Sequence, residues 1–459
     1  MLSPTPTRAP VDHLSHDELA QAILGYVADM PPGSVVAVQA PWGRGKTDVL
    51  ARVHARYVKR ASTANAPEPL WLNPWRYGSP NLIAPLVIEL LGPSRLKPEA
   101  RKGNERLRAA ARTLLRAGNA VAFKALSVVV PFGEILQAGK EPVDELIGQL
   151  FEQDGAAPPV DLDPVASMAD RFRELIDEYL TVTKSEHELV ICVDDLDRCL
   201  PDHQIAMLEA IHFLTSSGAR AYFVIALDPT LAQQAAVSHY AGLGFDTNQY
   251  LDKIFDLRIN LRALRRDTLA RLVDHGLARE LTVSGHWTSA GVALAQAVGV
   301  QEPEFREICR ASFYLPELTN PRFIARALWR LALVASANVQ FEVPQDSKPY
   351  VTNSHVAQAL VRLVVLSERW PAVRSLLQAS DQAFWQPNLE YFASSRGFMQ
   401  ADWSEADIVK AANRPGLAVR LPDAKQHPDL GEFLDGTLKV PEVGTLFYEI
   451  DQKLLAVGL

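Results

Sequence analysis

Cysteine is scarce in this sequence. The 459 residues include only three cysteines, and Cys192, Cys199 and Cys309 have the spacing of neither a disulfide framework nor a zinc site. The sequence also lacks a large excess of charge of one sign, because its formal net charge is only −8 at pH 7. This balance gives no overall signature of nucleic-acid binding. Few cysteines without a pairing pattern fit a reducing compartment, so we expect a cytoplasmic protein.

Long apolar runs are also missing. The longest candidate, residues 117–132, is interrupted by Asn119, Lys124 and Pro131, and it is too short and too polar to span a bilayer. Residues 1–10 are rich in Pro and Thr and lack the apolar segment of a signal peptide. We therefore expect no transmembrane span and no export signal.

The composition that remains is that of a globular protein, with 48% hydrophobic and 22% charged residues. Short apolar runs alternate with helical patterns up to residue 262. This alternation predicts an α/β fold, in which helices cover both faces of a parallel sheet. Beyond that residue the pattern is helical throughout, which predicts an α-helical C-terminal domain. We expect strands at 34–38, 70–73, 189–193, 221–227 and 256–261.

A chain of this length exceeds a single core, so we divide it into parts. Residues 1–262 are expected to form the α/β domain, with a basic helical insertion at about 95–155. A helical, lid-like domain is expected at 263–380, and a mixed, loop-rich region at 381–459. A Ser-x-x-Glu capping box that starts at Ser15 predicts where the first helix begins.

The strongest functional signal is the segment APWGRGKT at residues 40–47. An apolar strand precedes it and an amphipathic run, 48–53, follows it, as around a phosphate-binding loop. Successive backbone N–H groups there can surround a phosphate, helped by the positive end of the helix dipole. Ala40 stands where the usual pattern has its first glycine, and an ordinary strand-to-helix turn is the alternative. The expected nucleotide-binding residues are Pro41, Trp42, Gly43, Arg44, Gly45, Lys46, Thr47 and Asp48.

A second signal is the apolar strand at residues 190–195, which ends in two acids. Such a strand carries its last side chains to the edge of the sheet, beside the loop. Lys46 is expected to reach the β- and γ-phosphates, and the Thr47 hydroxyl to bind Mg²⁺. We expect Asp194 to hold the same ion and Asp195 to orient or deprotonate the attacking water. A helix N-cap at the end of the strand is the alternative.

Two further candidates follow. Asp228 ends the next apolar strand, where a polar side chain can contact the γ-phosphate, although Asp228 before Pro229 is also a good helix N-cap. Arg322 follows Asn320 and Pro321 in the first turn of a predicted helix, where a cation opposes the helix dipole. A nucleotide phosphate is one partner that would offset this cost, and a surface arginine is the alternative. An arginine acting across a subunit interface would favour an assembly.

A basic segment covers residues 95–124, in which nine residues are Arg or Lys. Arg108, Arg112 and Arg116 share one helical face through their four-residue spacing. Such a face can neutralise nucleic-acid phosphates. The alternative, which the acidic net charge favours, is a solvated or subunit-facing basic helix.

Together these residues resemble the KAP family of P-loop NTPases, a branch of the STAND-like ATPases. The resemblance covers about residues 15–380, and its most specific parts are the extended acidic motif and a tryptophan-rich strand. It rests on the segments 42–47 (WGRGKT), 71–77 (WLNPWRY), 194–199 (DDLDRC), 223–228 (FVIALD), 250–255 (YLDKIF) and 320–322 (NPR).

The resemblance implies an ATP-binding and ATP-hydrolysing molecular switch that uses Mg²⁺, with Lys46, Asp195 and Arg322 as catalytic residues. It implies coupling to a partner protein or a homo-oligomer, and a context in anti-phage defence or mobile elements. Many relatives carry membrane spans where this chain has its basic segment, so the resemblance implies a soluble form here. Two alternatives stay open: a non-hydrolysing nucleotide-dependent scaffold, which Ala40 motivates, and a nucleic-acid-binding ATPase that uses the basic insertion.

Overall fold

The computed structural model describes residues 12, 14–77, 82–92, 95–96, 104–126, 164–240, 247–283, 285–314, 320–394 and 428–459. It divides into two compact units, Met1–Arg262 and Ala263–Leu459. Of the basic insertion expected at about 95–155, residues 97–103 and 127–155 lie outside the described residues.

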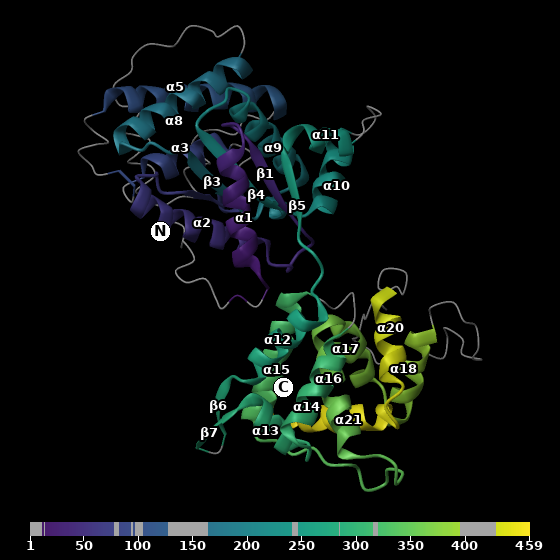
Figure 1. Ribbon diagram of the computed structural model, residues 1–459. Helices are drawn as coiled ribbons and strands as arrows, with labels where there is room; N and C mark the ends of the chain where they lie inside the picture. Colours follow the sequence, from purple (N-terminus) through teal and green to yellow (C-terminus); the bar gives the residue numbers. More distant parts are fainter. Residues whose placement is uncertain are drawn as a thin grey trace. The chain divides into compact units, whose positions relative to one another are not determined.

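The first unit is built around a five-stranded sheet in the order β2-β3-β4-β1-β5, in which all neighbouring strands are parallel. This confirms the predicted fold. Because the strands run in one direction, their carboxyl ends form a single edge of the sheet, and β4 alone separates β1 from β3 (Figure 1). The strands are β1 (Val35–Gln39), β2 (Leu70–Leu72), β3 (Leu189–Val193), β4 (Ala221–Leu227) and β5 (Leu257–Asn260).

Helices cover both faces of this sheet, which explains why β1 to β4 are continuous apolar runs. Side chains alternate between the faces, so Val35 and Ala37 of β1 pack on one side, and Val36 and Val38 on the other. The first face packs against α3 (Ile83–Leu91), α5 (Glu105–Leu126), α8 (Pro164–Thr183) and α9 (Pro201–Thr215), and the second against α1 (His16–Asp29) and α2 (Lys46–Ala64). Within the described residues, this unit also contains the helices α10 (Pro229–His239) and α11 (Thr247–Ile254).

Helix α1 begins differently from the prediction. Ser15 has a positive φ of 58° and its side chain caps no backbone N–H, so the expected capping box does not form. The carboxylate of Asp12 accepts hydrogen bonds from the backbone N–H groups of Leu14, His16 and Asp17 instead. Those N–H groups have no partner inside the helix, and an ionised carboxylate is a stronger acceptor than a serine hydroxyl.

The second unit is mostly helical, but the expectation of helices throughout is wrong at one place. Strands β6 (Glu280–Val283) and β7 (His286–Ser289) form an antiparallel hairpin that turns at Gly285, whose φ is +82°. Exposed and half-buried residues alternate along β6, which is the period of a strand on a surface. The helices are α12 (Arg266–Leu277), α13 (Ala290–Ala297), α14 (Glu302–Phe313), α15 (Pro321–Ser336), α16 (Asn353–Arg369), α17 (Pro371–Ala379), α18 (Trp385–Ser394), α20 (Pro428–Thr437) and α21 (Val443–Ala456).

A single hydrophobic core joins the helices on both sides of residue 380. Leu360 of α16 belongs to the same buried cluster as Trp385 of α18, Phe433 of α20 and Phe447 of α21, and all four side chains are fully buried. None of the helices within the described ranges combines the length and the apolar character needed to cross a membrane.

A buried ion pair reinforces this core. Asp451 of α21 is 0% exposed, and its Oδ1 lies 2.8 Å from Nη2 of Arg374 in α17. Gln378 donates hydrogen bonds to both carboxylate oxygens of Asp451, at 3.1 and 2.9 Å. The last helix is therefore tied to α17 by a carboxylate that has no access to water.

Replacing Asp451 with Ala is expected to lower the free energy of unfolding by about 3 kcal/mol, because the guanidinium of Arg374 then stays largely buried without its counter-charge. Chemical denaturation measures this loss. Asp346→Ala is the control, since Asp346 is an exposed acid of the same unit, and we expect it to change stability by less than about 0.5 kcal/mol. Equal losses in the two variants would contradict the importance of the pair.

Candidate active site

The predicted phosphate-binding loop connects β1 to α2 at the edge formed by the strands' carboxyl ends. Gly43 and Gly45 have positive φ angles of 80° and 95°. Gly45 is doubly constrained, because a Cβ there would lie 2.4 Å from Cε1 of His16. Helix α2 begins at the next residue, and its N-cap residue, Gly45, has no side chain that could cap the first turn. The N–H groups of that turn and the positive end of the helix dipole therefore suit an anion.

Ala40 is compatible with this loop. It is 3% exposed, its N–H bonds to the carbonyl of Leu227 at 3.2 Å, and it is not among the described residues with positive φ. Its backbone conformation therefore does not demand glycine. The carbonyl of Ala40 accepts a hydrogen bond from Lys46 Nζ at 2.8 Å, so this residue helps to hold the lysine.

The two side chains at the start of α2 both reach the acidic turn after β3. The Thr47 hydroxyl donates a hydrogen bond to Asp194 Oδ1 at 3.1 Å. Lys46 Nζ lies 3.0 Å from Asp197 Oδ2, and it also donates a weak hydrogen bond to the carbonyl of Pro41 at 3.4 Å. The structure thus brings together the loop and the paired acids that the sequence separates by about 150 residues.

Asp194 is the buried acid of the pair, only 4% exposed. Burial first, and then the negative charges of Asp195 and Asp197, raise the pKa of its carboxyl to about 6. A bound cation would stabilise the ionised form of such a group. No group of three or more His, Cys, Asp or Glu in the described part of the chain could hold a metal by itself. Mg²⁺ does not need one, because one or two protein oxygens, phosphates and water complete its octahedron, and Thr47 with Asp194 fits that requirement.

Asp195 is held by residues that sequence reasoning had not assigned. Asn73, which follows β2, donates from Nδ2 to Asp195 Oδ2 at 2.8 Å. Arg198 Nε lies 2.7 Å from the other carboxylate oxygen, and its guanidinium lies 5.5 Å from the ring centre of Trp75. The backbone of Asp195 has a positive φ of 58°. The only sequence signal for these partners was their presence in the tryptophan-rich and acidic segments.

A cleft of about 640 Å³ adjoins this turn. Trp42 of the loop and Trp75 line it, and each tryptophan is 53% exposed. Asp197, Arg198 and residues of α9 and α10 form other parts of its wall. The cleft is therefore continuous with the residues that contact Lys46 and Asp195.

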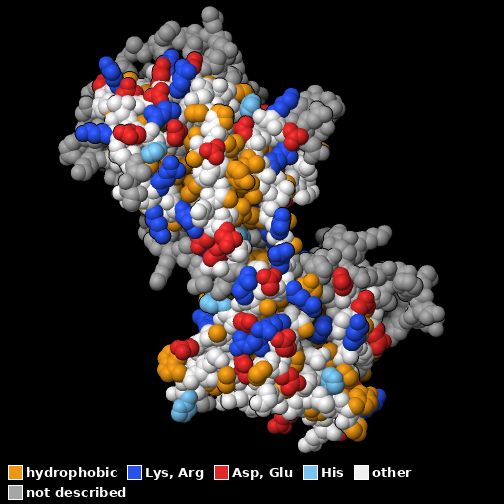
Figure 2. Space-filling view, viewed as in Figure 1, with side chains coloured by type: hydrophobic (Ala, Val, Ile, Leu, Met, Phe, Trp, Pro, Cys, Tyr) orange, Lys and Arg blue, Asp and Glu red, His pale blue; other side chains and the backbone are white. Residues whose placement is uncertain are grey.

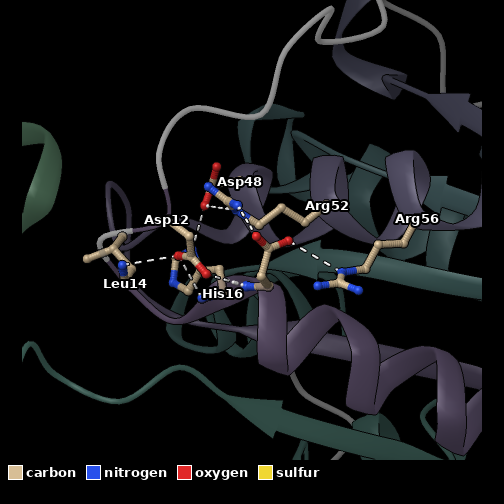
Figure 3. Close-up of polar contacts among 7 residues, drawn as sticks. Asp12, Leu14, His16, Asp48, Arg52 and Arg56 are labelled. Carbon is tan, nitrogen blue, oxygen red and sulfur yellow. Dashed lines mark hydrogen bonds and ion pairs between the residues drawn. The ribbon is translucent and has the colours of Figure 1, made fainter.

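Asp48 was expected to contact the nucleotide, but its side chain is engaged elsewhere (Figure 3). Its Oδ2 lies 2.7 Å from His16 Nδ1 and accepts a hydrogen bond from Arg52 Nε at 2.9 Å. Arg52 also pairs with Asp17 at 3.0 Å. Burial opposes ionisation of Asp48, but the hydrogen bonds from His16 and Arg52 outweigh it and lower the pKa of the carboxyl. The contact it makes here is structural, because it ties α1 to the start of α2.

Asp228 lies at the same edge of the sheet, directly after β4. Its carboxylate accepts a hydrogen bond from the backbone N–H of Thr230 at 3.0 Å and caps α10. The side chain is 7% exposed. The structure therefore shows the alternative role, the N-cap, and a contact with the γ-phosphate stays a prediction.

Arg322 belongs to the second unit. As expected, Asn320 caps the helix, because its Oδ1 accepts hydrogen bonds from the N–H groups of Arg322 and Phe323 at 3.0 and 3.3 Å. Arg322 is exposed in the first turn of α15. The loop belongs to the first unit, so the catalytic role of Arg322 stays a prediction.

Arg108, Arg112 and Arg116 of the basic segment lie in α5, which packs against the core of the first unit. The side chains of Arg108 and Arg112 are 17% and 11% exposed and lie 3.3 and 2.5 Å from the carboxylate oxygens of Glu105. The side chain of Arg116 lies outside the described part of the structure. Lysine and arginine are interspersed with acids on the face of this unit that Figure 2 shows. Arg108 and Arg112 are therefore poorly exposed for contact with a nucleic-acid backbone.

Two solved structures show a weak overall likeness to this chain. The Aeropyrum pernix ORC2 protein, solved in ADPNP and ADP complexes, is 11% identical with a TM-score of 0.36, covering 92% of this chain and 93% of that one. The Walker-type ATPase PABY2304 of Pyrococcus abyssi is 10% identical with a TM-score of 0.33, covering 92% and 96%. No curated protein matches the chain. The family described as the KAP family P-loop domain matches residues 16–333. The chain therefore belongs to the KAP family of P-loop NTPases.

Proposed function

We propose that this protein binds ATP with Mg²⁺ and hydrolyses it, and that the nucleotide state is communicated to a partner protein or to further copies of the chain. One observation carries the proposal: the hydroxyl of Thr47, at the start of α2, lies 3.1 Å from the carboxylate of Asp194, which directly follows β3. This contact joins the two halves of a phosphate and metal site that chemistry requires to be adjacent.

Each residue has a role that follows from its position. The loop residues 42–45 and the first turn of α2 offer N–H groups to the phosphates, and Lys46 adds a positive charge. Thr47 and Asp194 would hold Mg²⁺, which supplies neutralisation of the charge on the β- and γ-phosphates. One carboxylate oxygen of Asp195 accepts a hydrogen bond from Asn73, and the other pairs with Arg198. Each oxygen keeps a lone pair, so the carboxylate can accept a proton from water.

The alternatives lack an observation in their favour. The non-hydrolysing scaffold was motivated by Ala40, and the structure gives Ala40 a conformation that needs no glycine. The nucleic-acid alternative depended on arginines of which two are mostly buried and paired with Glu105. We also propose that Arg322 of one subunit stabilises the phosphoryl group that is transferred in the site of another subunit. A partner from anti-phage or mobile-element systems is supported only by the family resemblance.

Replacing Lys46 with Ala is expected to weaken ATP binding about 10- to 100-fold, because a charge-assisted contact with phosphate is lost. Isothermal titration calorimetry with Mg–ATP measures this change. Lys59→Ala, an exposed lysine on the same helix, is the control and is expected to bind as the unchanged protein does. Unaltered affinity in the Lys46 variant would refute the proposed site.

Asp195→Asn is expected to bind ATP within about threefold of the unchanged protein but to release phosphate at least about 100-fold more slowly, since the amide cannot take a proton. Phosphate release under saturating Mg–ATP measures the rate. A rate equal to that of the unchanged protein would remove Asp195 from the mechanism. Release by the unchanged protein that is no faster than by the Lys46 variant would instead favour the scaffold.

Ala40→Gly is expected to leave ATP affinity within about twofold, because the native φ at this position already suits alanine. It should lower the free energy of unfolding by about 0.5 to 1 kcal/mol, since glycine gives the unfolded chain more freedom. Titration calorimetry and chemical denaturation test the two parts. A large gain in affinity would mean that alanine distorts the loop.

A further inference from the structure

The third acid of the turn, Asp197, has no role in the function described so far. It lies in a short 3₁₀ helix (Leu196–Arg198) directly after the paired acids. Its side chain is 5% exposed, and Lys46, whose Nζ lies 3.0 Å from Asp197 Oδ2, has a side chain that is 9% exposed. The lysine that should bind phosphate is therefore already paired with an acid inside the protein.

The ammonium of Lys46 has three donors, and the protein itself supplies partners for them. The carbonyls of Ala40 and Pro41 accept hydrogen bonds at 2.8 and 3.4 Å. Asp197 contributes the charged contact. A phosphate that enters the loop must therefore displace or share one of these partners.

The contact with Asp197 is the one that a phosphate can replace most directly. Among the described residues, Asp197 Oδ2 is buried and receives no hydrogen bond, so its link to Lys46 is an ion pair without hydrogen-bond geometry. A phosphate oxygen surrounded by the loop's N–H groups offers the same negative charge with directed hydrogen bonds. The neighbouring cation, Arg198, does not compensate Asp197, because it pairs with Asp195.

The two states of the site then differ in how its charges are balanced. Without nucleotide, Asp197 compensates Lys46, and removal of either partner would leave a buried charge uncompensated. With nucleotide, Lys46 faces a second anion, and Asp197 lies beside the phosphates as a like charge. The acid therefore stabilises the empty loop and opposes the bound state.

We propose that Asp197 is the internal counter-ion of Lys46 and that it sets nucleotide affinity, because a phosphate must take the lysine from it. This inference rests on the proposed nucleotide site but not on hydrolysis. It makes Asp197 an affinity-determining residue, and it predicts opposite effects of one substitution on the empty and the occupied protein.

The test is Asp197→Asn, which keeps the shape of the side chain and removes its charge. Titration calorimetry with Mg–ATP and Mg–ADP is expected to show binding at least fivefold tighter than in the unchanged protein, while the nucleotide-free variant melts at a lower temperature. Asp202→Asn is the matched control, because Asp202 is an exposed acid at the start of α9, and it should alter neither quantity. Asp197→Glu keeps the charge and is expected to bind within about twofold of the unchanged protein.

Unchanged or weaker nucleotide binding by Asp197→Asn would overturn this proposal while leaving the nucleotide site intact. Absence of binding by the unchanged protein would instead overturn the proposed function. If Asp197→Asn does not fold without nucleotide in plain buffer, both proteins are melted in a stabilising osmolyte, with and without saturating Mg–ADP. A larger nucleotide-induced rise in Tm than in the unchanged protein supports the counter-ion role, and an equal or smaller rise refutes it.

Discussion

The parallel pairing of β4 with both β1 and β3 is the constraint on which the site depends. The pairing places Gln39 beside Leu227, and Val193 beside Ile225, so the residues after β1 and β3 emerge at one edge one strand apart. Lys46 and Thr47 then reach the acids after β3 without any distortion of the strands. A different strand order would leave both motifs intact and separate them in space.

Charge compensation around this edge is more extensive than nucleotide binding alone requires. Thr47 contacts Asp194, Lys46 pairs with Asp197, and Asp195 is engaged on both oxygens. Buried charges are tolerated only when they are paired, so each acid of the turn has a polar or cationic partner in the first unit. The turn therefore contacts the loop through Lys46 and the residue after β2 through Asn73, and it lines the cleft beside Trp75. Movement of this turn would change the surroundings of Lys46 and Asp195 together.

The second unit shows how local patterns fail near a surface and succeed in a core. Its helices bury wide apolar faces, and their periodicity predicted helices at 321–337 and 354–366, where the structure has α15 and α16. Strands β6 and β7 are only four residues long and bury little. The alternating pattern of a strand therefore repeats over too few residues to be told apart from the helical pattern that follows. The capping of α1 by Asp12 is a similar case, since the carboxylate reaches the helix from outside the predicted box.

Contiguous patterns determined the fold class, the phosphate-binding loop and the paired acids, because each depends on neighbours in sequence: an apolar strand, two glycines with a lysine, and acids where a strand ends. The tertiary structure alone decided the partners. Asn73 meets Asp195 across 122 positions because β2 pairs with β3. Asp48 turns toward His16 because α1 packs against the start of α2. Such contacts depend on sheet order, register and burial, and no local pattern encodes these.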